Sequence, residues 1–152
     1  MTGEPSAIIL RHYTADEAAQ WAERWLSVFG RQRYGVNAKA YLWHVFSGER
    51  YPSIAGQAAW EAYRQRSAPE YIVLANDRKS AYAVASLPVA SDLSDYCVFP
   101  PNLAWTMAFT HEDGWLGPYF ARHSAFERLD RDNRNAVEKQ RQVAEAKRKG
   151  WS

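Results

Sequence analysis

The sequence predicts an α+β domain in which N-terminal helices pack on a small antiparallel sheet and a charged C-terminal helix follows. Three observations predict this class. Apolar residues recur at helical spacing after Thr14, short β-branched and aromatic runs follow residue 70, and charged residues dominate after residue 121. With 152 residues we expect a single domain over 1–152, with a core at 7–121 and a charged helical tail at 122–152.

Three helices are expected in the N-terminal part. Residues 14–17 read Thr-Ala-Asp-Glu, which fits a capping box at the start of the first helix, and Gly30 is a natural stop. A second helix is expected from Asn37 to about Phe46, and a third from a Ser53 cap to near Arg66. The apolar face of the first helix would consist of Ala18, Trp21, Trp25 and Phe29.

Two hairpins are expected to form most of the sheet. The first joins residues 70–75 to 80–87 through an Asn-Asp-Arg-Lys turn, and the second joins 96–99 to 104–110 around Pro100. Residues 119–120 are expected to add a last short strand, and residues 7–10 form either a short strand or an apolar arm.

Composition and charge exclude several classes. The formal net charge is +2, but residues 121–152 carry the basic excess, so the body does not resemble a nucleic-acid-binding domain. Contact of the tail with nucleic-acid phosphates stays an alternative to a solvated helix of mixed charge.

The single cysteine, Cys97, excludes an internal disulfide and a cysteine-based zinc site. We expect a cytoplasmic protein, because we find neither a signal peptide nor a run of about 20 apolar residues.

The most distinctive segment runs from Ser80 to Phe120 and contains no lysine or arginine. It combines four acidic residues with eight aromatic residues. Acidic loops around aromatic side chains are typical of a surface that docks on a basic protein, because the charges steer the encounter and the rings supply affinity. The predicted partner-binding residues are Asp92, Asp95, Tyr96, Glu112, Asp113 and Trp115.

A second interpretation is a small enzyme or metal-binding protein that uses His44, His111 and Glu112. Neighbouring residues on a strand point to opposite faces, which disfavours proton transfer between His111 and Glu112. The chain has no Gly-x-Ser-x-Gly elbow and no glycine-rich phosphate loop. We therefore expect no catalytic residues, no metal and no cofactor.

Three segments resemble a family of small bacterial proteins. They are Trp-His-Val-Phe-Ser at 43–47, Trp-Thr-Met-Ala-Phe-Thr-His-Glu at 105–112 and Gly-Pro-Tyr-Phe at 117–120. The resemblance covers most of residues 10–121 and does not extend to the charged tail. It implies an immunity protein of a polymorphic or contact-dependent toxin system, which has no enzymatic activity and binds a cognate toxin domain; a nuclease is one such toxin domain. The oligomeric state stays open.

Overall fold

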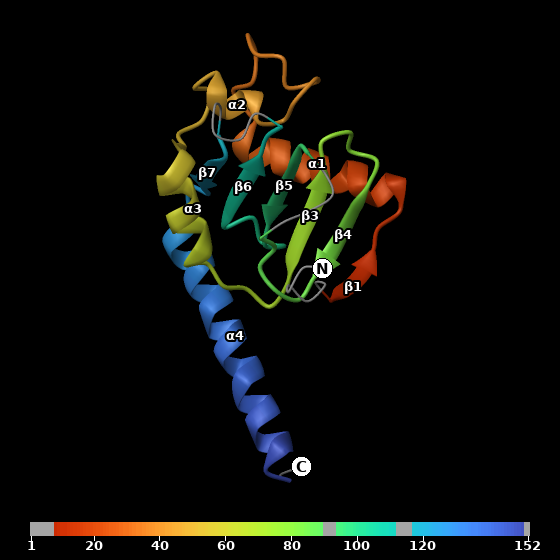
Figure 1. Ribbon diagram of the computed structural model, residues 1–152, viewed down its shortest axis with the longest axis vertical. Helices are drawn as coiled ribbons and strands as arrows, with labels where there is room; N and C mark the ends of the chain where they lie inside the picture. Colours follow the sequence, from red (N-terminus) through yellow and green to blue (C-terminus); the bar gives the residue numbers. More distant parts are fainter. Residues whose placement is uncertain (1–7, 90–93, 112–116, 151–152) are drawn as a thin grey trace, which may run out of the picture.

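A computed structural model describes residues 8–89, 94–111 and 117–150 and shows helices packed on one antiparallel sheet (Figure 1). The sheet has seven strands in the order β1-β4-β3-β5-β6-β7-β2. The predicted α+β class is therefore correct. The elements in chain order are β1 (Ile9–His12), α1 (Ala15–Phe29), α2 (His44–Ser47), β2 (Ile54–Ala55), α3 (Gly56–Arg64), β3 (Tyr71–Ala75), β4 (Ala81–Val84), β5 (Tyr96–Phe99), β6 (Trp105–Phe109), β7 (Tyr119–Arg122) and α4 (Phe126–Arg148).

Both predicted hairpins form, and they lie side by side because β3 also pairs with β5. In the second hairpin Tyr96 lies opposite Phe109, and the Leu103 amide donates to the Pro100 carbonyl at 2.8 Å in the turn. Strand β7 then pairs with β6, which confirms the expected last strand. The register places the start of β5 next to the end of β6. The chain therefore enters β5 before residue 96 and leaves β6 after residue 109 at neighbouring positions.

Helices cover both faces of the sheet, and alternate residues of each central strand face opposite cores. Ile72 and Leu74 belong to the core beneath α1, whereas Tyr71 and Val73 belong to the core beneath α3. Figure 1 shows α1 running across one face, with α3 and the start of α4 on the other side. Burial on both faces explains why β3, β5 and β6 consist almost entirely of apolar residues.

Helix α1 follows the sequence closely. The Glu17 amide donates to Thr14 Oγ1 at 3.1 Å, and the Thr14 amide donates to Glu17 Oε1 at 2.8 Å, which completes the capping box. Trp25 and Phe29 are fully buried. The Gly30 amide donates to the Leu26 carbonyl where the helix ends.

Two helix predictions are wrong in their extent. Residues 38–43 form turns and irregular backbone, and only His44–Ser47 are helical, because the Asn76 side chain binds the backbone of this loop. Its Oδ1 accepts from the Leu42 amide at 2.9 Å, and its Nδ2 donates to the Ala40 carbonyl at 2.7 Å. The third helix begins at Gly56, not at Ser53, since Ile54 and Ala55 pair with β7 as strand β2.

Helix α4 is attached to the body through its first two turns. Arg66 Nη1 donates to Asp130 Oδ2 at 3.0 Å, and the amides of Asn102 and Asn133 donate to each other at 3.1 and 3.2 Å. Asp130 and Asn133 are buried, whereas most residues after Asn133 are exposed. The helix therefore extends away from the sheet towards the C-terminus (Figure 1).

Candidate functional site

Rings from the three segments singled out in the sequence meet at one end of the sheet and form a cluster of five rings with Tyr41. We call this the aromatic–histidine cluster; it consists of Tyr41, Trp43, His44, His111 and Tyr119. Trp43 stacks on Tyr119 with ring centroids 6.3 Å apart and lies edge-on to His44 at 4.6 Å. Tyr41 contacts His44 at 5.3 Å and His111 at 5.2 Å, so one ring joins the two histidines. His44 and His111, two residues of the metal or enzyme interpretation, thus both contact Tyr41.

Asp95 links this cluster to the sheet. Its Oδ1 accepts from Trp43 Nε1 at 3.0 Å and from the His111 amide at 3.0 Å. The same oxygen lies 2.9 Å from His111 Nδ1. Charge-assisted hydrogen bonds of this kind are stronger than neutral ones. Asp95 therefore fixes the Trp43 and His111 rings relative to the start of β5.

The elements around the cluster position its rings. The loop before α2 brings Tyr41 and Trp43 to the sheet and is held there by Asn76. His111 lies two residues after the end of β6, and Tyr119 is the first residue of β7. His44 Nδ1 lies 2.8 Å from the Asn37 carbonyl oxygen, which orients that ring.

The predicted partner-binding residues divide into two groups. Asp92, Glu112, Asp113 and Trp115 lie outside the described residues. Asp95 is described, but its side chain is only 12% exposed and is engaged in internal hydrogen bonds. Tyr96 is 6% exposed and stacks on Phe109 at 4.6 Å, so its ring belongs to the core beneath α3. Asp95 and Tyr96 are thus mostly buried among the described residues, and their part in partner binding stays a prediction.

Sequence reasoning missed the part that Tyr41, Asn76 and Tyr119 play at this end of the sheet. The sequence places Tyr41 only within an expected helix and Asn76 only within a turn. The clustering of aromatic residues around His44 was visible in the sequence, but their partners come from distant segments.

The described residues contain no group of three or more His, Cys, Asp or Glu side chains suited to a metal ion. The hydrogen bond from His111 to Asp95 nevertheless orients an imidazole in the way that acid–base catalysis requires. Glu112, the third residue of the metal interpretation, lies outside the described residues.

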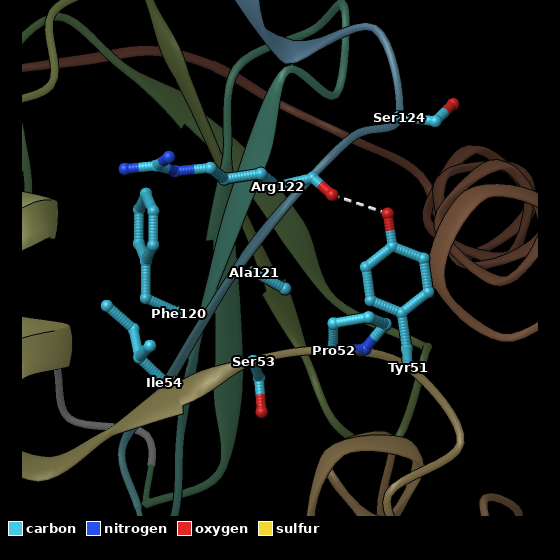
Figure 2. A pocket seen from close by; sticks show the side chains of 8 residues that line it. All are labelled: Tyr51, Pro52, Ser53, Ile54, Phe120, Ala121, Arg122 and Ser124. Carbon is cyan, nitrogen blue, oxygen red and sulfur yellow. Dashed lines mark hydrogen bonds between the residues drawn. The ribbon is translucent and has the colours of Figure 1, made fainter.

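An apolar cavity of about 590 Å³ lies elsewhere, at the β2 edge of the sheet. Figure 2 shows Phe120 and Ile54 on one side of it and Tyr51 on the other, where the Tyr51 hydroxyl donates to the Arg122 carbonyl. The cavity contains none of the predicted site residues. Its lining consists of Tyr51, Pro52, Ser53, Ile54, Phe120, Ala121, Arg122 and Ser124.

Several cations of the basic tail are paired within the tail. Arg141 lies 2.7 Å from Glu138, and Arg148 lies 2.9 Å from Glu145. This arrangement is typical of a solvated helix stabilised by its own ion pairs. In the part of the chain that the structure describes, no helix is long and apolar enough to cross a membrane.

Cys97 is buried in β5, as the sequence predicted. Burial raises the pKa of its thiol far above the ordinary range. The side chain therefore remains a neutral thiol at physiological pH, and it is poorly suited to nucleophilic chemistry.

The chain belongs to the family described as a domain of unknown function, DUF4275, whose model matches residues 16–120. The matched region begins in α1 and ends in β7, so it contains the whole aromatic–histidine cluster and excludes α4. No curated protein and no solved structure shows significant similarity to the chain.

Proposed function

We propose that this chain is an immunity protein that binds a cognate bacterial toxin domain in the cytoplasm and occludes its active cleft, without catalysis of its own. The observation that carries the proposal is the hydrogen bonding between Asp95 and His111. It ties the segment before β5 to the segment after β6, which are the two acidic parts of the lysine- and arginine-free stretch. Asp95 and His111, the described residues next to these two segments, are thus held together at one point.

The charge distribution supports a basic partner. Residues 80–120 carry four acidic residues and no lysine or arginine, and this composition suits contact with a positively charged partner. A toxin that cleaves nucleic acid has a basic substrate groove, and acidic side chains could replace phosphates there. The fixed positions of Asp95 and His111 would reduce the entropy cost of binding.

A pull-down from lysate of the native strain tests the proposal, with the tagged protein as bait and mass spectrometry as the readout. Stoichiometric recovery of one toxin-like polypeptide, followed by loss of that toxin's activity on addition of the purified protein, is the expected result. Recovery of a toxin whose activity stays unchanged would refute occlusion of the active cleft.

The interface is tested by charge reversal. Asp92, Glu112 and Asp113 are changed to lysine together, while Asp95 is kept because it accepts internal hydrogen bonds. The expected result is association slowed by about tenfold or more at low salt, with an unchanged melting temperature. The matched control reverses Glu61, Glu127 and Asp132, which are exposed and form no ion pair among the described residues. Equal slowing in both variants would indicate only a net-charge effect.

A second candidate function is acid–base catalysis, and the imidazole of His111 oriented by Asp95 is the observation that favours it. His44 shares the Tyr41 contact and would complete the site. Metal analysis of the purified protein and a hydrolase substrate panel test this function. Activity that disappears in His111→Gln, with the fold intact, would favour catalysis over the binding proposal.

A further inference from the structure

A basic groove lies between the end of α1, the loop that follows it and the β3–β4 turn. It consists of two hollows of about 410 and 520 Å³ that share Glu23, Leu26 and Arg33 in their walls. Four cations line the groove against the single carboxylate of Glu23. They are Arg31, Arg33, Lys39 and Arg78.

These cations are not neutralised by the protein. Among residues 8–89, 94–111 and 117–150, none of the four forms an ion pair, and Glu23 forms none either. The groove therefore keeps a formal surplus of three positive charges. A surplus of this size at a concave surface attracts anions, since the low-dielectric walls focus the field.

Two of the guanidinium groups are held in place by backbone carbonyls. Arg33 Nη1 donates to the Gly30 carbonyl at 2.8 Å, and Arg78 Nη2 donates to the Ala38 carbonyl. Each guanidinium has five N–H donors in a fixed fork, so these anchors leave other donors available. Groups fixed in this way lose little entropy when a ligand binds.

Arg78 has a donor that lacks a partner. Its Nε is buried and has no hydrogen-bond partner in the described structure. A buried N–H without an acceptor is costly, and native proteins normally supply one. This nitrogen is not accessible from the groove, so a ligand there would contact the terminal N–H groups of Arg78 and not Nε.

We propose that the basic groove binds a phosphorylated small molecule, a role that is independent of the toxin-binding proposal. Phosphate oxygens match the fork geometry of Arg33 and Arg78. The volumes of the hollows fall in the range of small-molecule sites, and Leu26 offers an apolar contact to the organic part of the ligand.

Isothermal titration calorimetry at low salt tests the proposal with pyrophosphate, ADP and adenosine as probes. The expected result is saturable binding of ADP at one site, weaker binding of pyrophosphate and no binding of adenosine. If ADP and pyrophosphate bind with equal affinity, the proposed contact of Leu26 with the organic part of the ligand is wrong. Failure of both phosphate probes to saturate, or adenosine binding as well as ADP, would overturn the site.

The variants separate the site from general electrostatics. Arg31→Gln with Lys39→Gln is the primary variant, because neither side chain forms a hydrogen bond in the described structure, so the fold should be unaffected. It should weaken ADP binding by about tenfold or more. The control, Arg141→Gln with Arg148→Gln, removes the same charge from α4 and should leave binding unchanged. Equal losses in both variants would contradict a specific groove.

Discussion

Trp25 of α1 donates a hydrogen bond from its indole Nε1 to Thr106 Oγ1 of β6 at 2.9 Å, and both side chains are fully buried. Thr106 in turn donates to the Val98 carbonyl of β5 at 3.2 Å. A single polar pair thus connects the helix to two adjacent strands within an apolar core. Such a pair fixes the position of the helix on the sheet, since a shift would leave a buried donor unsatisfied.

Thr106→Val keeps the shape of the side chain and removes its hydroxyl, so the Trp25 indole N–H loses its acceptor. We expect a loss of about 1–3 kcal/mol in the free energy of unfolding, measured by urea denaturation. Trp25→Phe is the second arm of a double-mutant cycle. The double variant should lose less than the sum of the single losses. Strict additivity would contradict the energetic coupling.

Trp105 is fully buried between α3 and the sheet, where it contacts Tyr63 and Phe120. Trp105→Ala should therefore cost roughly 3–5 kcal/mol through lost packing and the cavity that remains. Differential scanning calorimetry gives the change in melting temperature. The control is Tyr34→Ala, whose ring is 70% exposed, and it should change stability by no more than about 0.5 kcal/mol. A parental melting temperature for Trp105→Ala would disprove its place in the core.

Asp95→Asn removes the charge that holds Trp43 and His111. The substitution keeps one acceptor oxygen and should cost about 1.5–3 kcal/mol, the usual contribution of hydrogen bonds to a charged group. Thermal denaturation measures this cost. Asp77→Asn is the matched control, because Asp77 accepts only from the Lys79 amide in an exposed turn. Equal effects at both positions would mean that the Asp95 carboxylate has no special structural role.

His123 provides a pH dependence at the start of α4. Its Nδ1 accepts from the Ala125 amide at 2.8 Å, which requires an unprotonated nitrogen. Burial, and then the nearby Arg128, lower the pKa of His123 below its usual 6.5. Because the folded pKa is the lower one, this stabilisation is present above about pH 6.5 and is lost as the pH falls through the folded pKa.

Urea midpoints measured from pH 8 to pH 5 test this dependence. The stability of the parent should decline below about pH 6.5. The decline should be smaller in His123→Asn, which cannot be protonated and retains an acceptor. Parallel pH profiles for the two proteins would rule out His123 as the titrating group.

The sequence predicted the elements whose signals are local. Thr14 and Glu17 define the start of α1 because a capping box involves four consecutive residues. The hairpins were predictable because turn residues separate apolar runs. The loop before α2 was not, since its conformation depends on Asn76, whose contact with Leu42 joins residues 34 apart. Strand β2 has only two residues and no periodicity of its own.

The candidate site was predictable in part for the same reason. Its segments were visible as aromatic motifs in the sequence, but nothing in the sequence showed that these motifs would meet. The role of Asp95 was not visible, because its donors Trp43 and His111 lie 52 and 16 residues away. The Asp95 carboxylate was predicted to lie on a binding surface, but it instead accepts the hydrogen bonds that hold Trp43 and His111 in place.

Only the first two turns of α4 are attached to the body, so the inner and outer parts of this helix differ in stability. Amides near Asp130 and Asn133 should exchange with solvent only when the domain itself opens, since these turns are fixed to the body. Amides beyond Arg134 depend mainly on helix propensity and exposed ion pairs, which are weak and sensitive to salt. The outer half of α4 can therefore lose its helical structure as a separate unit, and a protease could remove it while the sheet and its two cores remain folded.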